Sequence, residues 1–570
     1  MKTKPIGEIL QELGYITEEQ KRIALEIQKL YKKKKLGEIL EELAFVTSKD
    51  VALALSYQYG RPYLDLREVS PTPEALKVLD KKVAEKLEVL PIRLVGKILF
   101  VAVLDPSREE IIEKLRRMTG YEIEYYITDR ESFYKAIKTH YYLLENPVDK
   151  HIKEFINQYL EAPTTAINKI PEFAKNILNM AILEKTTDIH ITPTKLATQI
   201  FYRIDGIMRH YYSIPSSIHD NLMSYIKLNS GMDIAERRRP QDGSFTHTFF
   251  DEEFDMRVST VPTQYGENMV IRLLSKNASL FKLKNLGFED DIYKKLQDLI
   301  NKPQGIILVT GPTGSGKTTT LYALLREINV LEKNVLTAED PIEYKFPFVR
   351  QTNVNEKINY NFATAIRHFL RQDPDIILIG EIRDEETAQM AIRASITGHL
   401  VLSTLHTNSA VGAIPRLVDM GIKSYMVAAG LVGIVAQRLA RRVCQFCITG
   451  EEYDVKEFAE KYGYSMETIE KINEYLKNTT GEDYIRDGKI KIHRGKGCEH
   501  CKGTGYQGRI TIAELLEVDK DVEELISRDE IITNIEARAR EKGMRVLRED
   551  GLIKIMKGIT SPEEIRRVIG

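Results

Sequence analysis

The 570-residue chain has no tryptophan and only four cysteines, and its 82 basic side chains nearly cancel its 83 acidic ones. So few cysteines exclude a disulfide framework. The charge balance argues against a broad cationic surface, so we expect no nucleic-acid partner. The N-terminus lacks the apolar stretch of a signal peptide, and the most apolar segment, Met426 to Ala436, is too short to span a bilayer. We therefore expect a cytoplasmic protein whose membrane contact is peripheral.

The chain begins with an internal repeat. Residues 6–17 return as residues 36–47, an offset of 36 − 6 = 30 residues. Each copy has the pattern of a short amphipathic helix, a turn and a threonine that caps a second helix. The copies end in matching glutamines, Gln28 and Gln58. Because two copies are too few for a solenoid, we predict a duplicated helical hairpin.

The rest of the chain divides by composition and pattern. Apparent strands at 98–103 and 121–127 alternate with a charged helix at 108–118, which predicts a small α+β unit. We assign residues 1–145 to an N-terminal domain, 146–169 to a polar linker and 170–278 to a middle domain of mixed helices and strands. Residues 279–570 alternate strands with helices from Gly305 onward, as expected for a parallel sheet with its ligand at the strand C-termini.

The most informative motif is the glycine-rich segment that begins at Gly311. It fits G-x-x-x-x-G-K-[ST] and lies between an apolar strand at 306–309 and a helix at 317–326. Glycines let the loop turn its N–H groups onto a polyphosphate, and the helix N-terminus attracts the same anion. We expect Lys317 to hold the β and γ phosphates and Thr318 to ligate Mg²⁺. The predicted nucleotide-binding residues are Gly311, Pro312, Thr313, Gly314, Ser315, Gly316, Lys317, Thr318 and Thr319.

Two further strands end in carboxylates. The apolar strand at 373–381 ends in Glu381, which we expect beside Mg²⁺ and the γ-phosphate. The strand at 335–343 ends in Glu339, Asp340 and Glu343, a crowding that favours a cation, and one of these acids is a candidate base. Taken alone, this segment also fits an acidic loop with a helix cap. The segment 398–408 contains a third strand flanked by two histidines, and His406 at its C-terminal end is a polar group that can sense the γ-phosphate.

The cysteines form two C-x-x-C pairs, Cys444 with Cys447 and Cys498 with Cys501. Four thiolates complete a closed tetrahedral Zn²⁺ site, which predicts a metal subdomain at about residues 440–512. The 498 − 447 − 1 = 50 intervening residues must then fold back. A redox dithiol is the alternative, but no thioredoxin-like context surrounds either pair.

Phosphoryl transfer also needs positive charge, which here must come from arginine. Arg257 and Arg272 lie outside the nucleotide domain, so they would reach a nucleotide only across an interface. No Asn-Lys-x-Asp segment follows the phosphate loop, which argues against a GTPase.

Together these motifs make the sequence resemble the secretion ATPases that drive type IV pilus assembly and type II secretion. The resemblance covers nearly the whole chain: the phosphate loop, the acidic segment 337–343, the segment 380–384, the histidine segment and the cysteine pairs. It implies a multidomain α/β protein with a RecA-like P-loop ATPase core and a PAS-like α+β middle domain. It also implies a homohexamer with ATP and Mg²⁺ at the domain junction, acting on an inner-membrane platform protein.

The resemblance assigns roles to single residues. It implies that Glu343 is the catalytic glutamate, that Glu381 is the Walker B glutamate and that His406 belongs to a histidine box. The implied arginines are Arg257, Arg272, Arg367, Arg371 and Arg383. Retraction motors of this family lack both a long N-terminal extension and the cysteine pairs, so this chain resembles the assembly motors. The rival functions are a RecA-type nucleic-acid motor and a nucleotide-responsive scaffold without turnover, and sequence alone does not separate pilus assembly from type II secretion.

The N-terminal repeat resembles a module that binds cyclic di-GMP in some relatives. Pro5 and Lys35 stand where that module usually has arginine, and Ala44 replaces a glycine. Arginine is the side chain best suited to grip phosphate or stack on guanine. We therefore expect a docking module first, and at most a weak receptor for cyclic di-GMP.

Overall fold

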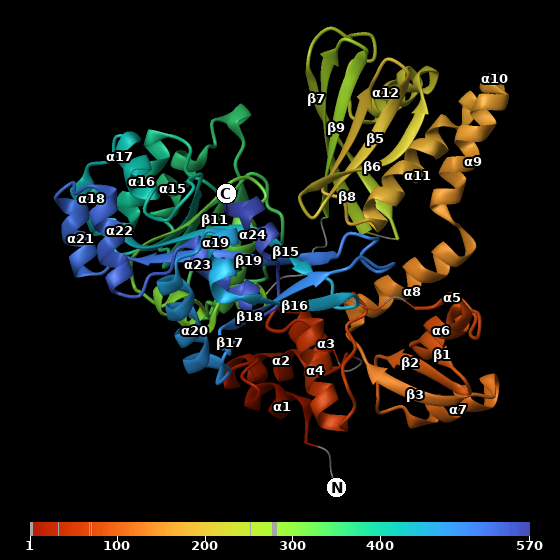
Figure 1. Ribbon diagram of the computed structural model, residues 1–570, viewed down its shortest axis with the longest axis horizontal. Helices are drawn as coiled ribbons and strands as arrows, with labels where there is room; N and C mark the ends of the chain where they lie inside the picture. Colours follow the sequence, from red (N-terminus) through yellow and green to blue (C-terminus); the bar gives the residue numbers. More distant parts are fainter. Residues whose placement is uncertain (1–3, 32–33, 68, 70, 251, 276–281) are drawn as a thin grey trace. The chain divides into compact units, whose positions relative to one another are not determined.

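The computed structural model describes residues 4–31, 34–67, 69, 71–250, 252–275 and 282–570. The chain divides into two units, residues 1–279 and 280–570, and each is described by itself (Figure 1). The predicted domain boundary at residue 278 lies outside the described residues. Among the described helices, none is both long and apolar enough to cross a membrane.

The repeat folds into four helices, α1 (Ile6–Glu12), α2 (Glu18–Leu30), α3 (Leu36–Glu42) and α4 (Ser48–Tyr59). Thr17 and Thr47 cap α2 and α4 through their side chains. Gln28 donates to the carbonyl of Lys34 at 3.1 Å, and Gln58 donates to the carbonyl of Lys4 at 2.6 Å. Each closing glutamine thus donates to the carbonyl of the residue two positions before the start of the other copy. The predicted duplicated hairpin is confirmed.

The α+β unit is also as predicted. Its elements are α5 (Pro73–Leu76), α6 (Lys81–Leu87), β1 (Val89–Val95), β2 (Ile98–Val103), α7 (Glu109–Thr119), β3 (Glu122–Ile127) and α8 (Arg130–Glu145). The sheet order is β1-β2-β3, with β1 antiparallel and β3 parallel to β2. One apolar cluster between this sheet and its helices forms the core.

Residues 146–169, which we expected to be a linker, carry the helices α9 (Val148–Glu161) and α10 (Pro163–Ala166). Four side chains of α9, spaced by four, three and four residues, are buried in the core of the middle domain: Val148, Ile152, Phe155 and Tyr159. Pro147 and Pro163 stand at the N-cap of α9 and in the first turn of α10, where proline does not disturb a helix. The polar composition and the two prolines concealed this one-sided apolar stripe.

The middle domain is one antiparallel sheet with helices packed on it. Its strands are β4 (Asp188–Pro193), β5 (Ala197–Ile204), β6 (Ile207–Pro215), β7 (Gln241–Phe249), β8 (Glu252–Thr263) and β9 (Gly266–Ser275), in the order β6-β5-β4-β9-β8-β7. The helices α9, α11 (Ile170–Leu183) and α12 (Ser216–Asn229) contribute to the apolar core beside this sheet. Alternate residues of each strand therefore remain on the other, more exposed face.

The second unit is built on a seven-stranded sheet, in the order β12-β11-β13-β14-β10-β15-β19. All neighbours are parallel except β19, which is antiparallel to β15. Its strands are β10 (Gly305–Thr310), β11 (Val335–Glu339), β12 (Arg350–Asn353), β13 (Ile376–Ile379), β14 (Leu400–Leu405), β15 (Leu431–Val443) and β19 (Tyr506–Glu517). Helices that include α13 (Asp290–Ile300), α14 (Lys317–Glu327), α15 (Phe362–Phe369) and α16 (Glu385–Ile396) help bury the sheet in two apolar clusters.

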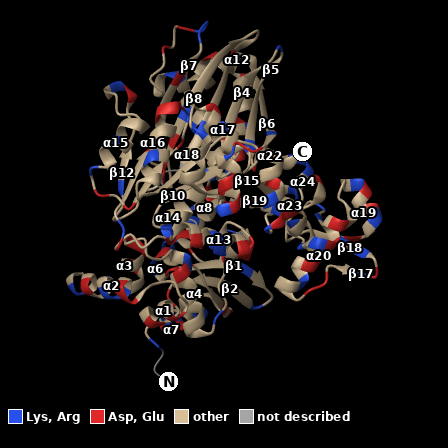
Figure 2. Cartoon of the chain, turned by 90° about the vertical axis from the view of Figure 1, so that its left-hand side faces the viewer, with Lys and Arg blue, Asp and Glu red and all other residues tan. Residues whose placement is uncertain are grey.

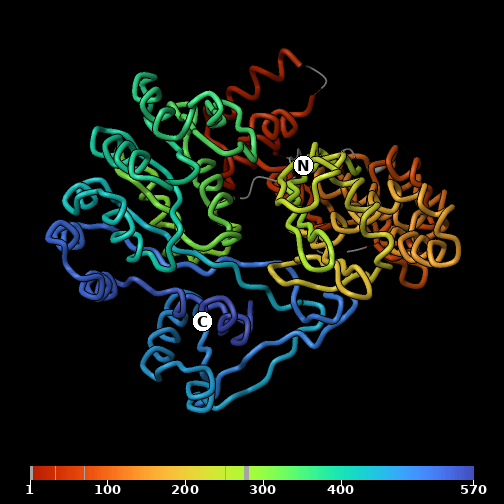
Figure 3. Tube along the Cα trace, turned by 90° about the horizontal axis from the view of Figure 1, so that it is seen from above, coloured from red at the N-terminus to blue at the C-terminus, as the bar shows by residue number. Residues whose placement is uncertain are grey.

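The residues between the two cysteine pairs fold back, as predicted. They form β16 (Ile448–Asp454), α19 (Val455–Tyr462), α20 (Met466–Thr480), β17 (Ile485–Arg486) and β18 (Lys489–Gly495). Because β16 and β18 are antiparallel and pair Ile448 with Gly495, the insert returns to the point where it left. The long strands β15 and β19 run side by side (Figures 1 and 3). The chain ends in α21 (Lys520–Ser527), α22 (Ile532–Glu541), α23 (Leu547–Met556) and α24 (Pro562–Ile569).

Candidate active site

The phosphate loop connects β10 to α14, as the motif predicts. Gly311, Gly314 and Gly316 have φ values of 149°, 79° and 87°, a region that side chains disfavour. At Gly311 a Cβ would also lie 2.6 Å from the carbonyl oxygen of Gln437. Glycine is therefore required here both by backbone conformation and by packing.

Two side chains of the loop fit a bound polyphosphate. Lys317 donates to the carbonyls of Gly311 at 2.9 Å and Pro312 at 3.1 Å, so its ammonium lies over the loop. Burial lowers the pKa of Lys317 below 10.5, an effect that an anion would oppose. The hydroxyl of Ser315 is buried and has no hydrogen-bond partner among the described residues. An unpaired buried donor beside a lysine suits the oxygen atoms of a phosphate.

Gln437 of β15 supports the loop, and sequence analysis missed it. Its amide nitrogen donates to the carbonyl of Ser315 at 2.7 Å, and its amide oxygen accepts from Thr320 at 2.9 Å. The residue is fully buried. No spacing rule connects it with a motif 120 residues earlier, so only the pairing of β15 with β10 reveals it.

Glu381, Arg383 and His406 lie together at the C-terminal ends of β13 and β14. Glu381 forms an ion pair with Arg383, and one of its oxygens lies 3.8 Å from Nε2 of His406. Burial and the positive charge of Lys317 lower the pKa of His406 below 6.5, although Glu381 opposes them. The imidazole is therefore mostly neutral at pH 7. Lys317, Glu381 and His406 are thus brought to one site, as the strand order requires.

Glu339 and Glu343, two of the three acids in the segment 335–343, have different surroundings. Glu339 is buried and accepts hydrogen bonds from Tyr322, from Thr337 at 2.5 Å and from Gln351 at 3.1 Å. Glu343 is exposed, and its backbone N–H donates to Tyr322 at 3.2 Å. The carboxylate of Glu339 is therefore held by three donors in the interior, whereas Glu343 is an exposed residue.

The predicted arginines fall into three groups. Arg383 lies at the site just described. Arg367 contacts Glu386 at 2.5 Å, and Arg371 contacts the ring of His368 at 2.7 Å. Both belong to the α15 region.

Arg257 and Arg272 are directly opposite each other on β8 and β9. Their guanidinium groups are half exposed, with Asp255 at 3.7 Å from Arg257 and Asp188 at 3.0 Å from Arg272. Like charges opposite each other across a sheet cost stability. Their position suits an anion that binds to this face.

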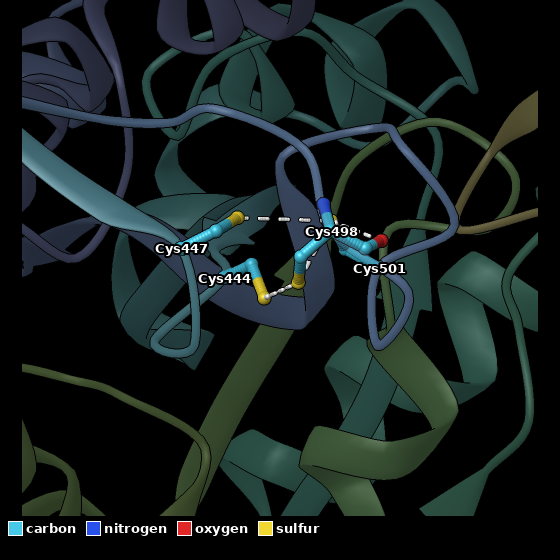
Figure 4. A group of neighbouring side chains, drawn as sticks. All are labelled: Cys444, Cys447, Cys498 and Cys501. Atoms are coloured by element: carbon cyan, nitrogen blue, oxygen red, sulfur yellow. Dashed lines mark hydrogen bonds between the residues drawn. The ribbon is translucent and has the colours of Figure 1, made fainter.

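The four cysteines form one cluster (Figure 4). Their sulfur atoms lie within 4.8 Å of one another, and three pairs are 3.8 Å apart: Cys444 with Cys498, Cys447 with Cys501, and Cys498 with Cys501. Four sulfurs at about 2.3 Å from a central Zn²⁺ would be separated by about 3.8 Å in a regular tetrahedron. Sulfur bonded to sulfur would be at about 2.05 Å. The cluster therefore fits a metal and is not a disulfide.

Comparison with known proteins agrees with this architecture. Residues 164–567 match the family described as type II/IV secretion system protein. The chain belongs to this family. It is a family of ATPases that serve secretion and pilus machinery.

The chain is 38% identical over 518 residues to the type IV pilus assembly ATPase PilB of Thermus thermophilus, covering 89% of this chain but 56% of that protein. It is 38% identical over 523 residues to PilB of Myxococcus xanthus, covering 90% of this chain and 89% of that protein. Type II secretion system ATPase E of Vibrio cholerae is 43% identical over 396 residues, covering 69% of this chain and 74% of that protein. The chain thus spans about half the length of the Thermus relative.

A second match lies in the N-terminal domain. Residues 59–146 match the MshEN domain, and they comprise the end of α4 and the α+β unit. Most of the duplicated hairpin precedes the matched region.

Proposed function

We propose that this chain is a cytoplasmic, homohexameric ATPase that drives assembly of a type IV pilus. The observation that carries the proposal is the phosphate loop, with Ser315 unpaired and Lys317 over it, beside Glu381 and His406. ATP with Mg²⁺ would supply the energy of phosphoryl transfer when bound. The loop from Gly311 to Thr319 would hold the phosphates, and Thr318 and Glu381 would hold the metal. The alternative within the family is assembly of a type II secretion pseudopilus.

The share of this chain that its relatives match favours pilus assembly over assembly of a secretion pseudopilus. The matches to the two pilus assembly ATPases span 89% and 90% of the chain, whereas the match to the type II secretion ATPase of Vibrio spans 69%. An N-terminal region that is shared beyond the motor core favours a shared partner at that region. We infer that this partner is an inner-membrane platform protein, which would place the motor at the cytoplasmic face of the inner membrane.

Within the site, Glu343 is our candidate for the base that activates water. It is exposed, whereas Glu339 is buried under three donors. Arg257 and Arg272 would stabilise the transferred phosphoryl group across a subunit interface, with Arg367, Arg371 and Arg383 as further candidates. The four cysteines would hold one structural Zn²⁺.

An assay of the purified chain tests the proposal. It should hydrolyse ATP in the presence of Mg²⁺, and Lys317→Ala should neither bind nor hydrolyse ATP. Basic and acidic residues are interspersed over the described chain in Figure 2, so we expect no stimulation by DNA. Strong stimulation by DNA would instead support a nucleic-acid motor. Normal nucleotide affinity without turnover would support a scaffold.

A further inference from the structure

Residues 406–410, which we call the strap, directly follow the last residue of β14. That residue, Leu405, pairs with Thr310 of β10, Thr310 pairs with Ala436 of β15, and Ala436 pairs with Glu514 of β19. The strap therefore begins at one end of a row of residues that crosses four neighbouring strands. His406 is its first residue.

The strap is attached to each of the next three strands, in their order in the sheet. The N–H of Thr407 donates to Oγ1 of Thr310 on β10 at 2.8 Å. Arg438 on β15 donates to the carbonyl and side-chain oxygens of Asn408 at 3.1 and 3.3 Å. The N–H of Ala410 donates to Glu514 on β19 at 2.5 Å. The first and last attachments involve backbone N–H groups at the two ends of the strap, and Arg438 holds its middle.

Arg438 also connects the strap to the support of the phosphate loop. Its other terminal nitrogen donates to the carbonyl of Gln437 at 3.0 Å, and it was this carbonyl that left no space for a Cβ at Gly311. The side chain of the same glutamine holds Ser315 and Thr320. One planar guanidinium thus bridges the histidine segment and the residue that shapes the phosphate loop. A lysine offers a point charge and could not reproduce this fork.

We propose that Arg438 is a positioning residue for ATP hydrolysis, which holds the strap so that His406 stays beside Glu381 while the phosphate loop keeps its shape. The inference rests on the proposed ATPase function. The role that we assign to Arg438 is exercised through the oxygens of Gln437 and Asn408 that it holds. Its effect should therefore be on turnover more than on ATP affinity.

The experiment compares steady-state ATP hydrolysis and ATP binding for the wild type, Arg438→Ala, Arg438→Lys and Arg442→Ala. Small displacements of catalytic groups cost up to about a hundredfold in rate, so we expect kcat to fall about ten- to a hundredfold in both Arg438 variants. The Kd for ATP should stay within about threefold, as expected when an interaction acts mainly in the transition state. Arg442 is an exposed arginine of the same strand, and its replacement should leave kcat unchanged. Thermal unfolding checks that each variant is folded.

A double variant tests the route through His406. If Arg438 acts by placing His406, then the His406→Ala variant should itself have a lowered kcat. Adding Arg438→Ala to that variant should lower kcat little further. Normal kcat in Arg438→Lys or in His406→Ala would overturn the inference. So would a double variant whose fold reduction in kcat equals the product of the reductions in the two single variants. If Arg438→Ala does not fold, Arg438→Lys decides the question. Absence of hydrolysis in the wild type would be a failure of the proposed function instead.

Discussion

At the scale of single residues, the candidate acids of the site differ in how far the fold buries them. The oxygens of Glu339 are occupied by Tyr322, Thr337 and Gln351. Glu381 is mostly buried and paired with Arg383, and Glu343 is exposed. A base must accept a proton from water, so it needs an accessible carboxylate. This distinction favours Glu343.

Glu343→Gln should keep ATP binding but lower turnover by roughly a hundredfold or more, the usual scale for loss of a general base. Binding of a fluorescent ATP analogue and release of phosphate would be measured on the same preparation. Lys317→Ala is the matched control, since it should lose binding itself. If Glu343→Gln hydrolyses ATP at nearly the wild-type rate, the base is another acid, and Glu381 becomes the next candidate.

The cysteine cluster gives a second prediction at this scale. Metal analysis of the purified chain should find about one zinc per protomer, as expected for a four-thiolate site. Cys498→Ser should lose the zinc and lower the melting temperature more than it lowers turnover, because the cluster ties the ends of the insert together and lies outside the phosphate loop. Four freely titrating thiols and no zinc would contradict this and favour the redox alternative.

At the scale of elements, the glycines of the repeat are explained by helix packing. Gly7 and Gly37 lie in the first turns of α1 and α3. A Cβ there would lie 2.9 Å from the side chains of Leu36 and Val51, respectively. Lys35, at a position where arginine is usual in the resembled module, contacts Asp105 of the α+β unit at 2.6 Å. These residues thus have structural roles that need no ligand.

We therefore expect weak or no binding of cyclic di-GMP to the full chain. Titration calorimetry should give no heat of binding at micromolar dinucleotide, because the chain lacks the two arginines that would grip phosphate or stack on guanine. Pro5→Arg combined with Lys35→Arg is the informative variant, since it restores both groups. Submicromolar binding by the wild type would instead make the repeat a second-messenger switch.

At the scale of the whole molecule, Arg257 and Arg272 belong to the first unit and the phosphate loop to the second. If they act across subunits, activity needs an assembled ring. Arg257→Lys should then preserve net charge yet lose most activity, because lysine lacks the bidentate fork that suits a phosphoryl group. Dilution of the wild type below the concentration at which it assembles should abolish ATP hydrolysis. The oligomer would be followed by light scattering. A fully active monomer would contradict the proposal.

The sequence by itself determined the features that depend on local spacing. The phosphate loop needs a strand, glycines and a helix in succession, the hairpins need a cap and an apolar stripe, and a metal knuckle needs two close cysteines. Each of these features depends on residues that are close in the sequence, so the α/β core, the duplicated hairpin and the cysteine cluster could be predicted.

Only the tertiary structure decided which distant residues meet. It placed Gln437 under the phosphate loop, attached the strap to three strands, set Arg257 opposite Arg272 and buried one side of α9 in the middle domain. These contacts follow from strand order, register and the burial of apolar faces, which are properties of the folded chain as a whole. A short sequence motif does not indicate these contacts, because the residues that meet are separated by tens to hundreds of positions.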